Sequence, residues 1–84
     1  MGTKDKLIAR FCSLPSDFTW DELKRMLGSL GYVIGNKGKT SGSRVIFQGD
    51  GLKPIMLHRP HPGNTVKAYM MRQIHDFLKN EGLI

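Results

Sequence analysis

The sequence of 84 residues has one cysteine, few acidic residues and no long apolar segment. A single cysteine, Cys12, excludes an internal disulfide and a cysteine-based zinc cluster, and its apolar neighbours predict a small buried side chain. No apolar run approaches the roughly 20 residues that span a bilayer, and the N-terminal segment lacks the apolar core of a signal peptide. We therefore expect a soluble, cytoplasmic protein with no membrane partner. This length also predicts a single domain, residues 1–84.

Acidic residues are scarcest in the middle of the chain. The protein has 13 Lys and Arg against 7 Asp and Glu, a net charge of +6, and the excess lies in residues 32–72, where Asp50 is the only acid. The basic residues of this segment are Lys37, Lys39, Arg44, Lys53, Arg59, Lys67 and Arg72. A concentrated positive field attracts polyanions, and without a basic amphipathic helix it favours nucleic acid over a membrane. The alternative is a basic surface that only keeps the protein soluble.

Two helices are expected in the first 31 residues. Apolar residues spaced three and four apart predict a helix over residues 4–13, which ends before Pro15. A capping box of Thr19 and Glu22 then predicts the start of a second helix. Gly31 has the position of the left-handed residue that ends this helix.

Three short strand-like runs follow, over residues 32–34, 44–47 and 55–57. Residues 49–51, Gly-Asp-Gly, predict a tight hairpin turn between the second and third runs. Together the runs predict a three-stranded antiparallel sheet.

The chain closes with a predicted helix that begins after Asn64 or Thr65 as its cap and ends at Gly82. The predicted order is helix, helix, three strands, helix. Helices collected on one face of an antiparallel sheet make a two-layer α+β domain, whose other face stays open to a ligand.

A glycine-rich stretch, residues 35–43, contains the Gly-Lys-Thr end of a phosphate-binding loop. It does not fit that motif, because the first glycine would fall at Val33 and a strand, not a helix, follows. We therefore expect no nucleotide hydrolysis. Two interpretations stay open: a loop in which Lys37, Lys39 and Ser43 hold a nucleic-acid phosphate, or an ordinary connection between strands.

Two histidines, His58 and His61, lie three residues apart in a proline-rich segment after the third strand. No cysteine or acidic residue is near them, so they are a weak zinc signal and we expect no metal. An unperturbed imidazole, with a pKa of about 6.5, suits proton transfer near neutral pH. The alternative is a surface pair that only caps backbone groups. His75, on the last helix, is expected on the surface or in packing.

The hairpin brings these histidines towards Arg44. Counting back from the turn places Arg44 opposite Leu57 and Ser43 opposite His58, and a shift of one residue pairs Arg44 with His58. In both registers a guanidinium, imidazoles and the lysines of the loop meet at one edge of the sheet. These groups suffice to cleave RNA by attack of its own 2′-hydroxyl, because they supply a base, an acid and cations for the charged phosphorane. Neither a metal nor a cofactor is expected.

These features resemble the HicA toxin family of bacterial toxin–antitoxin systems, from about Thr19 to Ile84. The resemblance is carried by Gly31-Tyr32, Gly42-Ser43-Arg44-x-x-Phe47, Leu57-His58-Arg59-Pro60-His61-Pro62 and Glu81-Gly82-Leu83-Ile84. It implies a fold like the double-stranded-RNA-binding domain, mRNA endoribonuclease activity and a HicB antitoxin that covers the active site. Residues 19–84 would form the family core. Residues 1–18 would be an N-terminal helical extension that packs on the helical face of the sheet or extends a dimer contact.

One position departs from the family pattern. Where the family usually has Gly-Ser-His, with a histidine that the resemblance assigns to catalysis, this chain has Arg44. Arginine cannot act as a general base, because its pKa lies above about 12. Either His58 or His61 is the base and Arg44 stabilises the transition state, or the protein binds RNA without cutting it. A third possibility is a basic edge that docks an acidic protein. The residues expected to bind RNA are Lys37, Lys39, Ser43, Arg59 and Lys67.

Overall fold

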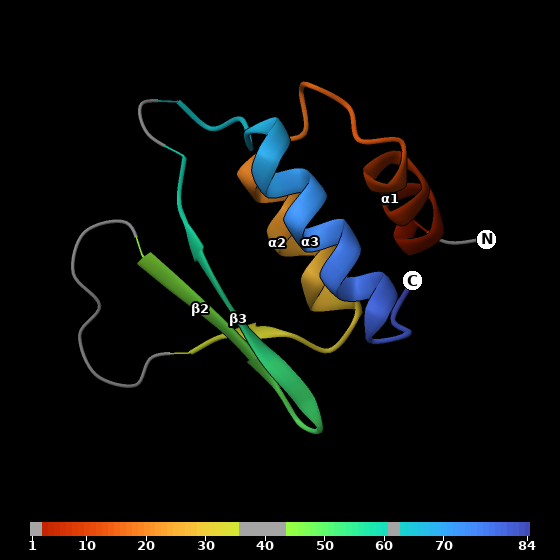
Figure 1. The fold of residues 1–84 in the computed structure, drawn as a ribbon, viewed down its shortest axis with the longest axis vertical. Helices are drawn as coiled ribbons and strands as arrows, with labels where there is room; N and C mark the ends of the chain where they lie inside the picture. Colours follow the sequence, from red (N-terminus) through yellow and green to blue (C-terminus); the bar gives the residue numbers. More distant parts are fainter. Residues whose placement is uncertain (1–2, 36–43, 61–62) are drawn as a thin grey trace.

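The computed structural model describes residues 3–35, 44–60 and 63–84. These residues form three helices and three strands in the predicted order (Figure 1). The bounds are Thr3–Cys12 for α1, Trp20–Ser29 for α2, Val33–Ile34 for β1, Arg44–Gly49 for β2, Leu52–His58 for β3 and Ala68–Asn80 for α3. None of these helices is long and apolar enough to cross a membrane.

Both ends of α2 follow the signals in its sequence. The Thr19 hydroxyl accepts a hydrogen bond from the Glu22 N–H at 3.2 Å, and the Glu22 carboxylate accepts one from the Thr19 N–H at 2.9 Å. At the other end Gly31 has a φ of 105°, and the Tyr32 N–H donates to the Leu27 carbonyl at 3.0 Å. The predicted capping box is therefore confirmed, and the helix ends in a Schellman motif, which needs the left-handed conformation that glycine adopts readily.

The start of α3 differs from the prediction. A cap by Asn64 or Thr65 is wrong, because Lys67 occupies the N-cap position and makes no side-chain cap hydrogen bond. Thr65 instead forms an isolated bridge with Thr19, and the Asn64 carbonyl accepts a hydrogen bond from the Trp20 N–H at 2.7 Å. The segment before α3 thus ties the start of α2 to the start of α3.

The sheet is antiparallel and has the order β1-β2-β3, with β2 in the centre. Arg44 lies opposite His58, so the register counted from the turn, which pairs Arg44 with Leu57, is wrong by one residue. The cause is a β-bulge near the turn, where β3 sets both Lys53 and Pro54 against a single residue of β2. Proline has no N–H to donate to the ladder, and within sheets it occurs on edge strands such as β3 and at bulges.

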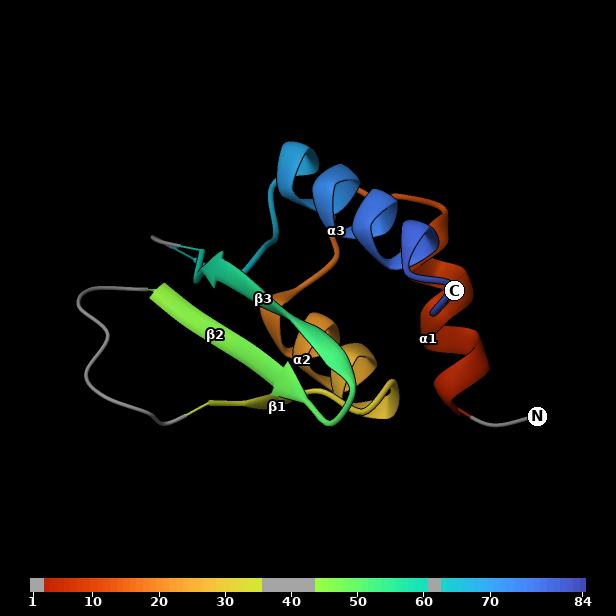
Figure 2. The ribbon, with the colours of Figure 1, turned by 60° about the horizontal axis from the view of Figure 1, so that its bottom comes forward.

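The helices lie on one face of the sheet, which confirms the two-layer α+β class (Figure 2). The core lies between the two layers. Side chains of alternate positions in β2 and β3 point into it and are at most 8% exposed; they are Val45, Phe47, Ile55 and Leu57. Helix α1 packs against α2 and α3, on the side of the helices away from the sheet (Figure 2).

Helix α1 is attached by one buried ring and one charged side chain. The ring of Phe11 is fully buried, and its centroid lies 5.5 Å from that of Phe18. Arg10 Nε donates to a Glu22 carboxylate oxygen at 2.9 Å, which joins α1 to the capping box of α2. Cys12 is exposed, so the predicted burial of its thiol is wrong. It follows Phe11 by one residue, about 100° around the helix, and this turns it away from the core.

Candidate nucleic-acid interface

The candidate site lies at the end of the sheet farthest from the hairpin turn. Arg44 begins β2 and His58 ends β3, and the two are partners in the antiparallel register. Directly opposite residues project from the same face of a sheet, with Cβ atoms about 4.5–5.5 Å apart. Both side chains are exposed, whereas their neighbours Val45 and Leu57 point into the core. A guanidinium and an imidazole therefore stand side by side on the face opposite the helices.

This pairing depends on the bulge. Without it Val45 would lie opposite Met56, so a buried and a 58% exposed side chain would have to share one face. With the bulge Val45 lies opposite Leu57, both facing the core, and Arg44 with His58 falls on the open face. A slip of one residue would move every side chain of a strand to the other face of the sheet. The burial pattern therefore selects the register that pairs Arg44 with His58, which counting from the turn did not predict.

Two other predicted RNA-binding residues lie at the same end of the molecule. Arg59 directly follows β3 and is exposed, and Lys67, also exposed, is the N-cap of α3. Figures 1 and 2 both show the start of α3 on the side where β3 ends. The first turn of α3 has no acidic residue, so the partial positive charge of the helix start is not offset there. The remaining predicted site residues, Lys37, Lys39, Ser43 and His61, lie outside the described residues.

The cations at this end have no ionic partner within the part of the chain that the structure describes. Carboxylates pair elsewhere: Asp17 and Glu22 with Arg10, Asp21 with Lys24, Glu81 with Lys53, and Asp76 with His75. No described carboxylate pairs with Arg44, Arg59 or Lys67. Their positive charges are therefore open to an external anion such as a phosphate.

The third histidine lies apart from this site. His75 is on α3 and half-buried, with its ring centroid 6.1 Å from that of Phe11 and its Nδ1 3.4 Å from an Asp76 carboxylate oxygen. This agrees with the expectation that His75 lies on the surface or in packing. Over residues 3–35, 44–60 and 63–84, no cluster of three or more His, Cys, Asp or Glu side chains could hold a metal ion.

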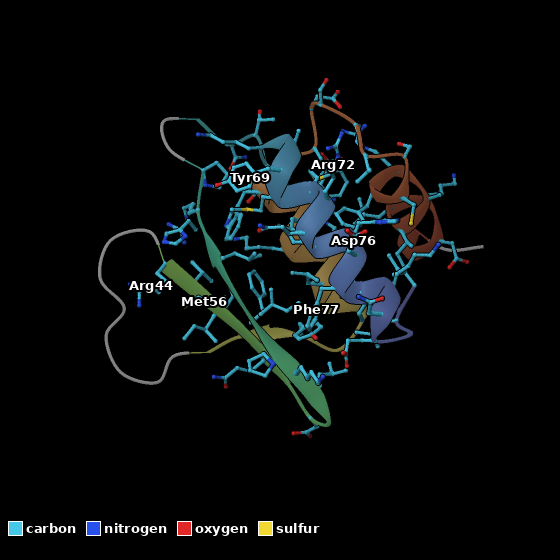
Figure 3. The ribbon with its side chains drawn as sticks, viewed as in Figure 1. Arg44, Met56, Tyr69, Arg72, Asp76 and Phe77 are labelled. Carbon is cyan, nitrogen blue, oxygen red and sulfur yellow. The ribbon has the colours of Figure 1, made fainter. Side chains whose placement is uncertain are left out.

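One exposed residue at this end was not predicted to have a functional role. Tyr69, in the first turn of α3, is 58% exposed, and Figure 3 shows it on the side of α3 towards the end of β3. In the sequence it stands among apolar residues, as a core tyrosine would. The available signal was helical phase, because Met70 and Ile74 form the buried stripe of α3 and Tyr69 falls beside it.

Comparison with models of protein families identifies the family of this chain. A family model described as HicA toxin of bacterial toxin-antitoxin matches residues 20–83, which run from the start of α2 to just beyond α3. No curated protein and no solved structure matches the chain.

Proposed function

Because the chain belongs to the HicA toxin family of bacterial toxin–antitoxin systems, we propose that it is an endoribonuclease that cleaves mRNA in the cytoplasm. We further propose that a HicB-type antitoxin inhibits it. The pairing of Arg44 with His58 on the open face of the sheet carries the proposal. The excess of basic residues in 32–72 supports a polyanionic substrate.

In the proposed reaction RNA supplies its own nucleophile, the 2′-hydroxyl beside the scissile phosphate. His58 accepts the proton of this hydroxyl, and the 2′-oxygen attacks phosphorus. The bond from phosphorus to the 5′-oxygen of the next nucleotide breaks, and this oxygen takes a proton from an acid, for which His61 is the candidate. The products are a 2′,3′-cyclic phosphate and a free 5′-hydroxyl. The reaction requires no metal and no cofactor.

Arg44 has a different role in this scheme. A guanidinium stays protonated at neutral pH and cannot accept the proton, so the base is assigned to the imidazole opposite it. The planar N–H donors of Arg44 suit a phosphate, and they stabilise the extra negative charge of the phosphorane. Contacts to neighbouring phosphates are proposed for Lys37, Lys39, Ser43, Arg59 and Lys67.

The proposal is tested by His58→Ala, with end-labelled mRNA and protein freed of its antitoxin, at neutral pH in EDTA. We expect the wild type to produce new ends that carry a cyclic phosphate. Loss of a general base should lower the cleavage rate by about 10²–10⁴-fold, while gel retardation of the RNA persists. His75→Ala is the matched control and should cleave like the wild type. Cleavage by His58→Ala at the wild-type rate would remove His58 from the mechanism.

A second candidate function, a module that binds RNA without cutting it, is favoured by Arg44 at the position of the family's histidine. It predicts retardation by the wild-type protein without new RNA ends, and binding that weakens as salt rises. If the wild type neither cleaves nor retards RNA, both candidates are wrong. The basic end of the sheet would then be a docking surface for an acidic protein.

A further inference from the structure

We propose that Tyr69 is a stacking platform for an unpaired base of the RNA that reaches the Arg44–His58 pair. This inference rests on the proposed function and adds to it that the substrate is single-stranded at that point. It is carried by the exposure of the Tyr69 ring, by the exposed basic residues at the start of α3 and by the position of this helix start on the side where β3 ends.

The exposure of Tyr69 is unlike that of the other aromatic residues in the described part of the chain. Five of them are 2% exposed or less: Phe11, Phe18, Trp20, Tyr32 and Phe47. Phe77 is partly buried against the core. Tyr32 shows what a packed tyrosine does here, because its ring is buried and its hydroxyl donates to the Lys53 carbonyl at 2.8 Å. Tyr69, at 58% exposed, presents a ring that the core does not use.

The surroundings of Tyr69 are cationic. Lys67 lies two residues before it and Arg72 three residues after it, and both are exposed. Figure 3 shows Arg72 on the side of α3 away from Tyr69, so Lys67, the N-cap of α3, is the basic residue nearer to the end of the sheet. The nearest acidic residue along α3, Asp76, comes one turn beyond Arg72 and is placed 3.4 Å from His75. An exposed ring on a basic part of the surface suits a nucleotide, whose base stacks while its phosphates meet the charges.

The place of Tyr69 links it to the candidate site. The first turn of α3 lies at the end of the molecule where β3 finishes, in both Figure 1 and Figure 2. Figure 3 shows Tyr69 at the start of α3 and Arg44 at the start of β2, with β3 between them in this view. Arg44 lies on the open face and Tyr69 on the helical side, so an RNA strand that turns around the end of the sheet from Arg44 towards α3 would reach the ring. In a duplex each base already stacks on its neighbours, so the ring selects an unpaired base.

The experiment uses uridine oligonucleotides with 2′-O-methyl groups, which block the nucleophile, and one 2-aminopurine at successive positions. Anisotropy reports binding, and 2-aminopurine fluorescence reports stacking. We expect the wild type to quench the fluorescence at one preferred position. Tyr69→Leu should lose this quenching and bind about tenfold more weakly, within the range for loss of one base–aromatic stack. Tyr69→Phe should behave like the wild type, because the ring and not the hydroxyl is used.

Two controls isolate the ring. Val33→Ala, at an exposed apolar position on the edge strand β1, should bind and quench like the wild type. Annealing the complementary strand should abolish the difference between Tyr69→Leu and the wild type. Circular dichroism of each variant checks that α3 is intact.

The outcomes separate the inference from the proposed function. If the wild type binds RNA but Tyr69→Leu has the same affinity and quenching, the stacking role is wrong and the proposed function stands. If the wild type binds no RNA, both are wrong. If Tyr69→Leu binds RNA normally but loses affinity for the antitoxin, the ring is a protein contact, which also overturns the inference.

Discussion

The helical side of the molecule and the open end of its sheet use arginine in opposite ways. Among the helices, Arg10 donates to Glu22 at 2.9 Å and to Asp17 at 3.2 Å. At the open end of the sheet, Arg44 stands beside His58 and pairs with no described carboxylate. The first guanidinium is satisfied within the protein and stabilises the contact between α1 and α2. The second, with no described carboxylate partner, is available to an external anion. The role of each arginine is therefore indicated by the groups that it contacts and not by its residue type.

The burial of apolar side chains also differs between the helical side and the open face of the sheet. Phe11 of α1 is fully buried between helices, although α1 precedes the matched family region. On the open side of the sheet Val33 and Met56 are 66% and 58% exposed, although they lie in strands. We therefore expect substitutions among the helices to lower the free energy of unfolding strongly, and substitutions on the open face of the sheet to change it little. The following predictions test this division, from the largest expected effect to the smallest.

Phe11→Ala should have the largest effect on stability. Removal of a fully buried ring from a packed core lowers the free energy of unfolding by about 3–5 kcal/mol. Urea denaturation followed by circular dichroism measures it. Cys12→Ala, the adjacent exposed residue of α1, is the matched control and should stay within about 0.5 kcal/mol of the wild type. A loss below about 1 kcal/mol for Phe11→Ala would show that residues 1–18 are only an appendage of the 19–84 core.

Glu22→Gln should have a smaller effect that depends on pH. Hydrogen bonds from Arg10 and from the Thr19 backbone lower the pKa of Glu22 from 4.5 to about 2. Because the folded state has the lower pKa, the ionised carboxylate stabilises the protein above pH 4.5, and this stabilisation is lost as the pH falls towards 2. At pH 7 we expect a loss of about 1 kcal/mol, since water screens the partly exposed pair and glutamine still serves a capping box.

Urea denaturation of the wild type and of Glu22→Gln at several pH values between 7 and 2 tests this prediction. The difference in unfolding free energy between the two proteins should shrink over the acid range. Asp21→Asn is the control, because the Asp21 carboxylate is 66% exposed and 3.8 Å from Lys24. A Glu22→Gln difference that stays constant down to pH 2 would contradict the assigned role of the charge.

Met56→Thr should have the smallest effect. The side chain lies on the open face in the middle of β3, so its loss removes little buried surface and should change the unfolding free energy by less than about 0.5 kcal/mol. Leu57→Ala, at the next position but facing the core, should cost about 2–5 kcal/mol. Similar losses for the two variants in thermal or urea denaturation would show that the open face contributes to stability after all.

Most of the fold was predictable because its signals are local. The capping box of Thr19 and Glu22 and the left-handed Gly31 and Gly82 act within a few residues of the chain, and all have their predicted geometry. Errors occurred where local signals competed with distant partners. Thr65 has the chemistry of a helix cap, but it pairs with Thr19, 46 positions away in the sequence, and α3 begins later.

The candidate site was predictable in composition but not in arrangement. The basic segment and the histidines are evident in the sequence. The pairing of Arg44 with His58 depends on the bulge at Lys53-Pro54. Pro54 was the residue in the sequence that could have indicated this bulge. The exposure of Tyr69 depends on which side of α3 meets the core.

The sequence by itself determined the order of the elements, the helix ends and the region of positive charge, because each follows from residues adjacent in the chain. Only the tertiary structure decided that Arg44 faces His58, that Cys12 is exposed and that Tyr69 is left outside the core. These properties depend on contacts between segments that are distant in the sequence. The register and packing of these segments are selected because all the apolar side chains must be buried together, and no single neighbouring residue determines them.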